Sequence, residues 1–195
     1  DGAVRVISIA DREKTQFAEG ELPESTRNVY PSCLIDKVEE PAVSLLQSYI
    51  EYTGQKEGPL SMQFFWKAGE GIQVCEIAAR FFGYEHELLE AQDIRKPLMH
   101  GAVLYFHGRL KQIQEQQAAY ELAEDKAVVK PWIFYEAGEE VVAYGPNPYL
   151  ALYYIEAGSR EELDEISRDF FEKMSMTDPD GEEIVFQNKI PKYSL

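Results

Sequence analysis

Three polar side chains near the middle of the chain have the types and spacing of a small binding site for a metal ion and an anion. They are Gln63, Glu76 and Arg80. A carboxylate and an amide carbonyl offer hard oxygen ligands that suit Mg²⁺, which takes one or two protein groups and completes its shell with water and phosphate oxygens. A guanidinium beside them would bind a phosphoryl or carboxylate group. The same residues would also suit the wet face of an ordinary hairpin, so spacing alone leaves both interpretations open.

The segments that carry the first two of these residues predict a β-hairpin. Residues 62–66 (MQFFW) and 72–77 (IQVCEI) are rich in aromatic and β-branched side chains, and residues 68–71 (AGEG) give a turn signal. Gly69 and Glu70 would be the central residues of a two-residue turn, with glycine first as a type II′ turn prefers. We therefore expect two antiparallel strands joined by a tight turn.

This turn would place Gln63 directly opposite Glu76. Side chains opposite one another share a face of the hairpin, as do side chains two apart on one strand. Gln63, Glu76, Ala78 and Arg80 would then line one surface, as far as the second strand continues.

Two other turns would change this register. A three-residue turn centred on Glu70 would place Gln63 opposite Ile77 and exchange the two faces. A turn centred on Glu70 and Gly71 would keep the faces but pair Gln63 with Ala78. The sequence leaves these alternatives open.

Composition narrows the class of protein. With 195 residues, of which 45% are hydrophobic, the chain is long enough for one sizeable core or two small subdomains. No run of about 18 apolar residues occurs and the N-terminus has no signal-peptide pattern, so the cytoplasm is the expected location. The net charge of −16 repels phosphate backbones and anionic membranes, which argues against nucleic-acid and membrane partners. Cys33 and Cys75 match neither a disulfide framework nor a metal-binding spacing, so we expect both to be reduced and buried.

The first residues predict a strand without its partner. Asp1-Gly2 is a typical hairpin turn, and residues 3–10 (AVRVISIA) have the pattern of a strand. Because no strand precedes this turn, we expect the chain to be part of a longer protein. Asp11 and Arg12 follow as a solvated strand end or, as a second option, as a charged pair at the rim of a site.

Periodicity and turn signals predict the other elements, which together give an α+β fold. Residues 11–31 have the composition of a polar, turn-rich connection. Pro41 would lie in the first turn of a helix that ends at Thr53, before Gly54. The remaining expected elements are helical or partly helical segments at 84–93 and 98–106, a helix at 109–122, strands at 128–135, 140–144, 149–157 and 184–186, and a helix opened by the capping box Ser159-x-x-Glu162.

The central motif resembles the signature of a known superfamily. Glu76-Ile77-Ala78-Ala79-Arg80 is similar to the E-x-N-P-R signature of ATP-grasp enzymes, and residues 62–64 resemble the N-x-Q-F segment of the carbamoyl phosphate synthetase large subunit. The form Glu-Ile-Ala-x-Arg is also similar to carboxyaminoimidazole ribonucleotide synthetase. The resemblance covers residues 1–90, and the final α+β unit resembles, more loosely, the C-terminal domain of the biotin carboxylase-like and purine branches.

The resemblance implies roles for individual residues. Gln63 and Glu76 would bind the Mg²⁺ or Mn²⁺ ions that bridge the ATP phosphates, and Arg80 would contact a phosphate or the acyl phosphate. The family's asparagine, a further metal ligand, falls at Ala78, which cannot coordinate a metal. His86 lies near the position where some branches hold a substrate-side histidine, although a surface histidine would look the same.

The resemblance also implies the reaction and the organisation of the chain. ATP would phosphorylate a small carboxylate substrate, and an amine or similar nucleophile would attack the acyl phosphate. The family's nucleotide-binding lysines and Gly-rich loop find no match here, so we expect the C-terminal half of an ATP-grasp fold, inactive without an upstream domain of the same protein. The expected divisions are a metal-binding half at 1–108, a connecting helix at 109–125 and a small α+β subdomain at 126–195. A homodimer is left open.

Two other classes compete with this enzyme. The chain could be a non-catalytic ATP-grasp-like module for assembly or regulation, as the alanine at position 78 would allow. It could also be an unrelated metal hydrolase, with His100 and His107 on one helix face. The hydrolase is the weakest candidate, because no third ligand and no H-E-x-x-H motif accompany the two histidines.

Overall fold

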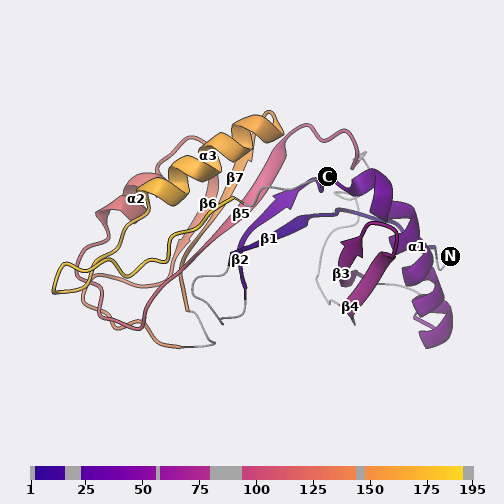
Figure 1. Cartoon of the computed structure of the whole chain (residues 1–195), viewed down its shortest axis with the longest axis horizontal. Helices are drawn as coiled ribbons and strands as arrows, with labels where there is room; N and C mark the ends of the chain where they lie inside the picture. The colour runs from indigo at the N-terminus through magenta and orange to yellow at the C-terminus, as the bar shows by residue number, and fades with distance from the viewer. Residues whose placement is uncertain (1–2, 16–22, 56–57, 80–93, 144–147, 191–195) are drawn as a thin grey trace. The chain divides into compact units, whose positions relative to one another are not determined.

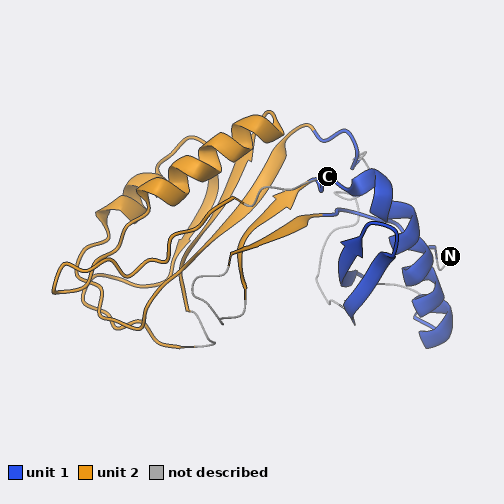
Figure 2. Cartoon of the chain, in the orientation of Figure 1, with its two compact units in different colours: residues 1–9, 31–97 blue, residues 10–30, 98–195 orange. Residues whose placement is uncertain are grey.

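The structure is a computed structural model, which describes residues 3–15, 23–55, 58–79, 94–143 and 148–190 (Figure 1). It separates into two compact units (Figure 2). Unit 1 comprises residues 1–9 and 31–97, and unit 2 comprises residues 10–30 and 98–195. Both contain helices and antiparallel strands, so the predicted α+β class is confirmed. The functional division at residues 108 and 126 stays a prediction.

Unit 1 contains one long helix and a β-hairpin. Helix α1 spans Ile35–Thr53, strand β3 spans Leu60–Lys67 and strand β4 spans Gly71–Ala79. The helix ends where the sequence predicts, because Gly54 takes a left-handed φ of 72° and its N–H donates to the carbonyl of Ile50.

The predicted start of α1 is wrong. The helix begins six residues before Pro41, which lies inside it on the exposed side. The buried residues of α1 are Ile35, Val38 and Ala42, so packing of this first part outweighs the one backbone hydrogen bond that proline removes.

The strand predicted at residues 3–10 is also absent from the described structure. Those residues have no regular secondary structure. The backbone N–H of Val4 donates to the side chain of Gln47, and the carbonyl of Ile9 accepts from the N–H of Ser32. An alternating pattern alone does not make a strand, because a strand also needs a partner for its ladder of hydrogen bonds.

Unit 2 is a five-stranded antiparallel sheet with two helices on one face (Figure 1). The strand order is β1-β2-β5-β7-β6. The strands are β1 (Asp11–Thr15), β2 (Glu24–Tyr30), β5 (His100–His107), β6 (Val128–Ile133) and β7 (Tyr149–Ala157), and the helices are α2 (Gln117–Ala123) and α3 (Arg160–Lys173).

Two predictions at the start of this sheet are wrong. Strands β1 and β2 occupy the segment that was expected to be a polar connection, and β5 occupies the segment expected to be helical at 98–106. Strands β1 and β2 are rich in polar residues because they contribute the buried ion pair of Glu13 and Arg27. In the sequence, such a polar composition is typical of a loop. The short apolar run of β5 is compatible with either a buried helix or a central strand. It forms a strand here because it pairs with β2 on one side and β7 on the other.

The helix predicted at 109–122 is much shorter than expected. Only Gln117–Ala123 is helical, and in the preceding segment Gln112 and Glu115 form isolated bridges instead. Ile113 is fully buried there, with its N–H donating to the carbonyl of Glu139 and its carbonyl accepting from Gly138. Burial of Ile113 and these bonds outweigh the helix propensity of the glutamines.

The C-terminal predictions are largely confirmed. Strand β7 has the expected bounds, β6 lies within the expected strand at 128–135, and α3 begins after Ser159, whose hydroxyl accepts from the N–H of Glu162 (3.1 Å). The strands predicted at 140–144 and 184–186 are wrong: residue 144 lies outside the described ranges, and the described residues of both segments form only isolated bridges.

The core of unit 2 lies between the sheet and α3. Leu163 and Phe170 of α3 are fully buried against sheet residues that include Phe106 and Tyr153. The rings of Tyr153 and Phe170 meet edge to face, with centroids 5.5 Å apart.

Gly108 marks a close approach in this core. A Cβ atom there would lie 2.3 Å from Leu150 Cδ1 and 2.7 Å from the carbonyl oxygen of Ile184. We expect Gly108→Ala to lower the free energy of unfolding by about 1–3 kcal/mol, because the backbone of Ile184 must shift. Urea unfolding measures this change. Gly158→Ala is the control, since its Cβ would meet nothing closer than 3.4 Å, and an equal loss in both variants would contradict the prediction.

A charged turn at residues 178–181 lies in the C-terminal segment. Asp178 is 2% exposed, its Oδ1 accepts from the N–H groups of Asp180 and Glu182, and its Oδ2 pairs with Lys111. The hydrogen bond from Lys111 and the bond from the Glu182 N–H lower the pKa of Asp178.

The lowered pKa of Asp178 makes stability depend on pH. Because the folded pKa lies below the unfolded one, the contribution is present above the unfolded value of about 3.9 and disappears as the pH falls through the folded value. We expect Asp178→Asn to show a weaker loss of urea stability between pH 5 and the acid limit of folding than the parent chain shows. Parallel curves for the two proteins would contradict this expectation.

Candidate functional site

The hairpin of β3 and β4 has the register that the sequence predicts at its critical pair. Gln63 lies directly opposite Glu76. Ser61 lies opposite Ala78, and Met62 lies opposite Ile77. The alternatives in which Gln63 faces Ile77 or Ala78 are therefore excluded.

The predicted turn is nevertheless wrong. The last pair before the turn is Lys67 with Gly71, so the loop has three residues, 68–70. Gly69 and Gly71 have positive φ angles of 82° and 78°, and the N–H of Glu70 donates to the carbonyl of Lys67. A bulge at Cys75 then moves the pairing by one residue and restores Gln63 opposite Glu76.

The burial of the hairpin confirms which face carries the polar residues. Ser61, Gln73 and Glu76 are exposed, and Gln63 is half-buried beside them. On the other face Met62, Phe64, Trp66, Ile72 and Ile77 are half-buried. The ammonium group of Lys37, on α1, lies 5.1 Å from the ring centroid of Trp66. The face with Met62, Phe64 and Trp66 is thus the more buried one, although Val74 on it is 42% exposed, and the face with Gln63 and Glu76 is the more open one.

This open face presents oxygen donors on two adjacent cross-strand pairs. Directly opposite residues have Cβ atoms about 4.5–5.5 Å apart, so the Gln63 carbonyl and the Glu76 carboxylate can reach a common ion. Ser61 adds a hydroxyl beside Ala78. Ser61 is not among the predicted site residues, although its place two residues before Gln63 puts it on the same face.

The donor set fits Mg²⁺ but does not enclose it. Among the described residues, no group of three or more His, Cys, Asp and Glu side chains is placed to hold a metal. A carboxylate and an amide oxygen are hard ligands, and Mg²⁺ commonly takes so few protein groups when phosphate oxygens supply others. The two residues therefore fit an ion that arrives with a phosphate ligand.

Several predicted site residues are placed elsewhere or not at all. Arg80 and His86 lie outside the described residues. His100 and His107 stand at the two ends of strand β5, not on a helix, so they are about 24 Å apart at 3.4 Å per residue. His107 is buried, with its Nε2 3.0 Å from the carbonyl oxygen of Ser25. The two histidines therefore do not form one site.

The two cysteines differ from the prediction in their burial. Cys33 and Cys75 are free of disulfides, but both are exposed. Cys75 is the bulged residue of β4, which removes it from the packed face of the hairpin. The predicted burial is therefore wrong.

None of the helices in the described ranges has the length and apolar character that a membrane crossing needs. No protein-family model and no curated protein sequence matches this chain.

Solved structures share the fold of this chain. The L-amino acid ligase from Bacillus licheniformis superposes with a TM-score of 0.68 and 16% identity, covering 91% of this chain and 49% of the ligase. Phosphoribosylglycinamide synthetase from Anaerococcus prevotii gives 0.64 and 12% over 91% of this chain and 50% of the enzyme. The biotin carboxylase domain of Hydrogenobacter thermophilus 2-oxoglutarate carboxylase, in complex with MgADP, ADP and bicarbonate, gives 0.52 and 13% over 83% and 40%.

The chain spans about half the length of the first two structures. All three are ATP-grasp enzymes, the group that the central motif resembles. The chain therefore has the fold of part of an ATP-grasp enzyme.

Proposed function

We propose that the chain supplies the metal and phosphate site of an ATP-dependent ligase, which activates a carboxylate as an acyl phosphate for attack by an amine or similar nucleophile. One observation carries this proposal: Gln63 and Glu76 are directly paired on the open face of a hairpin, within part of an ATP-grasp fold. A structural neighbour that holds MgADP and bicarbonate supports the choice of ligand.

Each site residue has a defined task in this proposal. The Gln63 carbonyl and the Glu76 carboxylate bind Mg²⁺ or Mn²⁺ and fix the position of the ATP phosphates, and Arg80 is the catalytic residue that stabilises charge on the transferring phosphoryl group. When bound, the metal neutralises negative charge on the phosphates. No covalent nucleophile from the protein is required.

The proposal predicts metal-dependent nucleotide binding without turnover. The full chain should gain thermal stability with ATP and Mg²⁺ together and lose this gain when EDTA removes the metal. It should form no product with any carboxylate and amine tested, because it spans only about half the length of the enzymes that share its fold. ATP stabilisation that persists in EDTA would contradict the metal site. Turnover by this chain alone would contradict its dependence on an upstream domain.

A non-catalytic module is the second candidate, and one observation favours it. Ala78 occupies the position of the family's asparagine and is half-buried opposite Ser61. We expect Ala78→Asn to strengthen Mn²⁺ binding in the presence of ATP, since it adds an oxygen donor to the same face. Ala78→Ser, which adds a shorter donor, is the matched control. No gain in either variant, together with no nucleotide binding by the parent, would favour the module.

A further inference from the structure

The sheet of unit 2 is completed by a segment that is distant in sequence. Strands β1 and β2 belong to residues 10–30, whereas the rest of the unit is residues 98–195. Only β2 pairs with the remainder of the sheet, through the four residues Arg27–Tyr30 against β5. The position of the β1–β2 hairpin therefore depends on this short pairing, on contacts with α3, and on a few further bonds that Thr15, Ser25 and Asn28 make with β5 and the C-terminal segment.

The apolar pattern of β2 specifies this pairing weakly. Among the four paired residues, Val29 and Arg27 are fully buried on the helix side of the sheet, and only Val29 is apolar. Asn28 and Tyr30 are half-buried on the other side. Strands without a clear apolar face are prone to shift along their partners.

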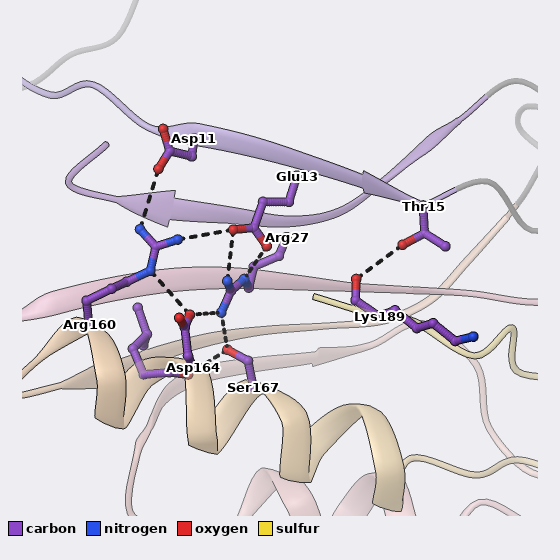
Figure 3. A network of polar contacts seen from close by, with 9 residues as sticks. Asp11, Glu13, Thr15, Arg27, Arg160, Asp164, Ser167 and Lys189 are labelled. Carbon is purple, nitrogen blue, oxygen red and sulfur yellow. Dashed lines mark hydrogen bonds and ion pairs between the residues drawn. The ribbon is translucent and has the colours of Figure 1, made fainter. Parts of the chain in front are cut away.

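Three polar side chains on one face of α3 contact the β1–β2 hairpin. Arg160, Asp164 and Ser167 follow the i, i+4, i+7 spacing of one helix face (Figure 3). Arg27 Nη1 donates to Asp164 Oδ1 (2.7 Å) and to Ser167 Oγ (3.0 Å). Arg160 approaches Asp11 Oδ2 (3.4 Å) and Glu13 Oε1 (3.1 Å) on β1. Every one of these contacts joins the hairpin to α3.

A different contact holds the hairpin together internally. Arg27 Nε and Nη2 donate to the two carboxylate oxygens of Glu13, at 2.7 and 2.8 Å, and both residues are buried. A shift of the whole hairpin by two residues would keep this pair. It would move Arg27 about 7 Å from Asp164 and Ser167, leaving a buried guanidinium partly without acceptors. A shift by one residue would turn Arg27 to the other face of the sheet.

We propose that Asp164, Ser167 and Arg160 of α3 select the register of the β1–β2 hairpin on β5, with Arg27 as the group they recognise. The Glu13–Arg27 pair neutralises the guanidinium within the hairpin, and the α3 groups fix where the hairpin sits. The chain passes from unit 1 to unit 2 just before Asp11, where β1 begins, and returns to unit 1 just after Tyr30, where β2 ends. The register of the hairpin therefore also fixes which residues of β5 lie beside the end of β2.

Cross-linking in the full chain tests this proposal. In a background with Cys33→Ser and Cys75→Ser, Asn28→Cys is combined with Val103→Cys, its partner in the native register, or with Tyr105→Cys, its partner after a two-residue shift. Directly paired positions fall within disulfide reach and diagonal ones do not, so we expect the native pair to oxidise at least about tenfold faster. Val103→Cys with Tyr154→Cys, across β5 and β7, is the control pair.

The network is then removed in two ways. The apolar variant Glu13→Leu, Arg27→Met, Asp164→Leu keeps side-chain volume without charge, and the milder variant Asp164→Asn, Ser167→Ala keeps the Glu13–Arg27 pair. We expect the preference for the native pair to fall to within about twofold in the apolar variant and to drop in the milder one, with the control pair unchanged. An undiminished preference in a folded apolar variant overturns the proposal. If the apolar variant does not fold, an undiminished preference in the milder variant overturns it.

Discussion

Arg27→Ala should lower the free energy of unfolding of the chain by about 3–5 kcal/mol, a large part of the stability of a typical domain. Arg27 is fully buried, and four of its N–H contacts go to Glu13, Asp164 and Ser167. Truncation leaves the Glu13 carboxylate buried at the sheet, with Arg160 Nη2 still 3.1 Å from its Oε1. The loss of stability therefore comes mainly from the buried Glu13 carboxylate that has lost its main partner, and only partly from the hydrogen bonds of Arg27 themselves.

Urea unfolding followed by circular dichroism measures this loss. Arg168→Ala is the matched control, because Arg168 is an exposed arginine on α3 whose removal should change stability by no more than about 0.5 kcal/mol. Equal stability of the two variants would show that the buried network does not hold the hairpin to α3.

Glu76→Gln should weaken binding of the Mg²⁺–ATP complex by at least about tenfold. Loss of a residue that only orients a metal ligand already lowers metal affinity by about tenfold or more, so loss of a direct ligand should cost at least as much. The substitution keeps the size and the exposed position of the side chain but removes its negative charge. Because the other proposed ligand, Gln63, is neutral, Glu76 supplies the only formal charge of the described pair. The free energy of unfolding without ligand should change little, since Glu76 is exposed.

Calorimetric titration of ATP in the presence of Mg²⁺ measures this effect. Glu70→Gln makes the same charge change in the turn of the same hairpin, where Glu70 pairs with Lys67, and should leave the affinity close to that of the parent. Equal losses in the two variants would indicate a general electrostatic effect of the hairpin and not a metal ligand.

The sequence predicts the hairpin well because its signals are local. Aromatic and β-branched residues flank a glycine-rich turn, and the polar residues alternate on one face. The pairing of Gln63 with Glu76 is correct although the turn is not, because the bulge at Cys75 compensates for the longer loop. Bulges depend on packing across the strands, so a turn rule alone could not foresee this compensation.

The errors in unit 2 arise where tertiary contacts outweigh local preference. Strands β1 and β2 contain inward-facing Glu13 and Arg27, whose burial is favourable only once α3 supplies Asp164 and Ser167. The i, i+4, i+7 polar series on α3 was the available signal, since such a series beside an apolar stripe indicates a helix that contacts charged groups. Similarly, the segment before α2 is not helical despite its helix propensity, because its extended conformation buries Ile113.

The most direct test of the proposed site uses Mn²⁺ in place of Mg²⁺, because its unpaired electrons broaden the NMR signals of nearby nuclei. With Mn²⁺ and ATP added to the full chain, we predict that the side-chain amide signals of Gln63 and the backbone signals around Glu76 broaden first, and that Glu76→Gln removes this broadening while Glu70→Gln keeps it. Broadening that is absent from the hairpin, or that is the same in all three proteins, would contradict a metal and phosphate site at Gln63 and Glu76.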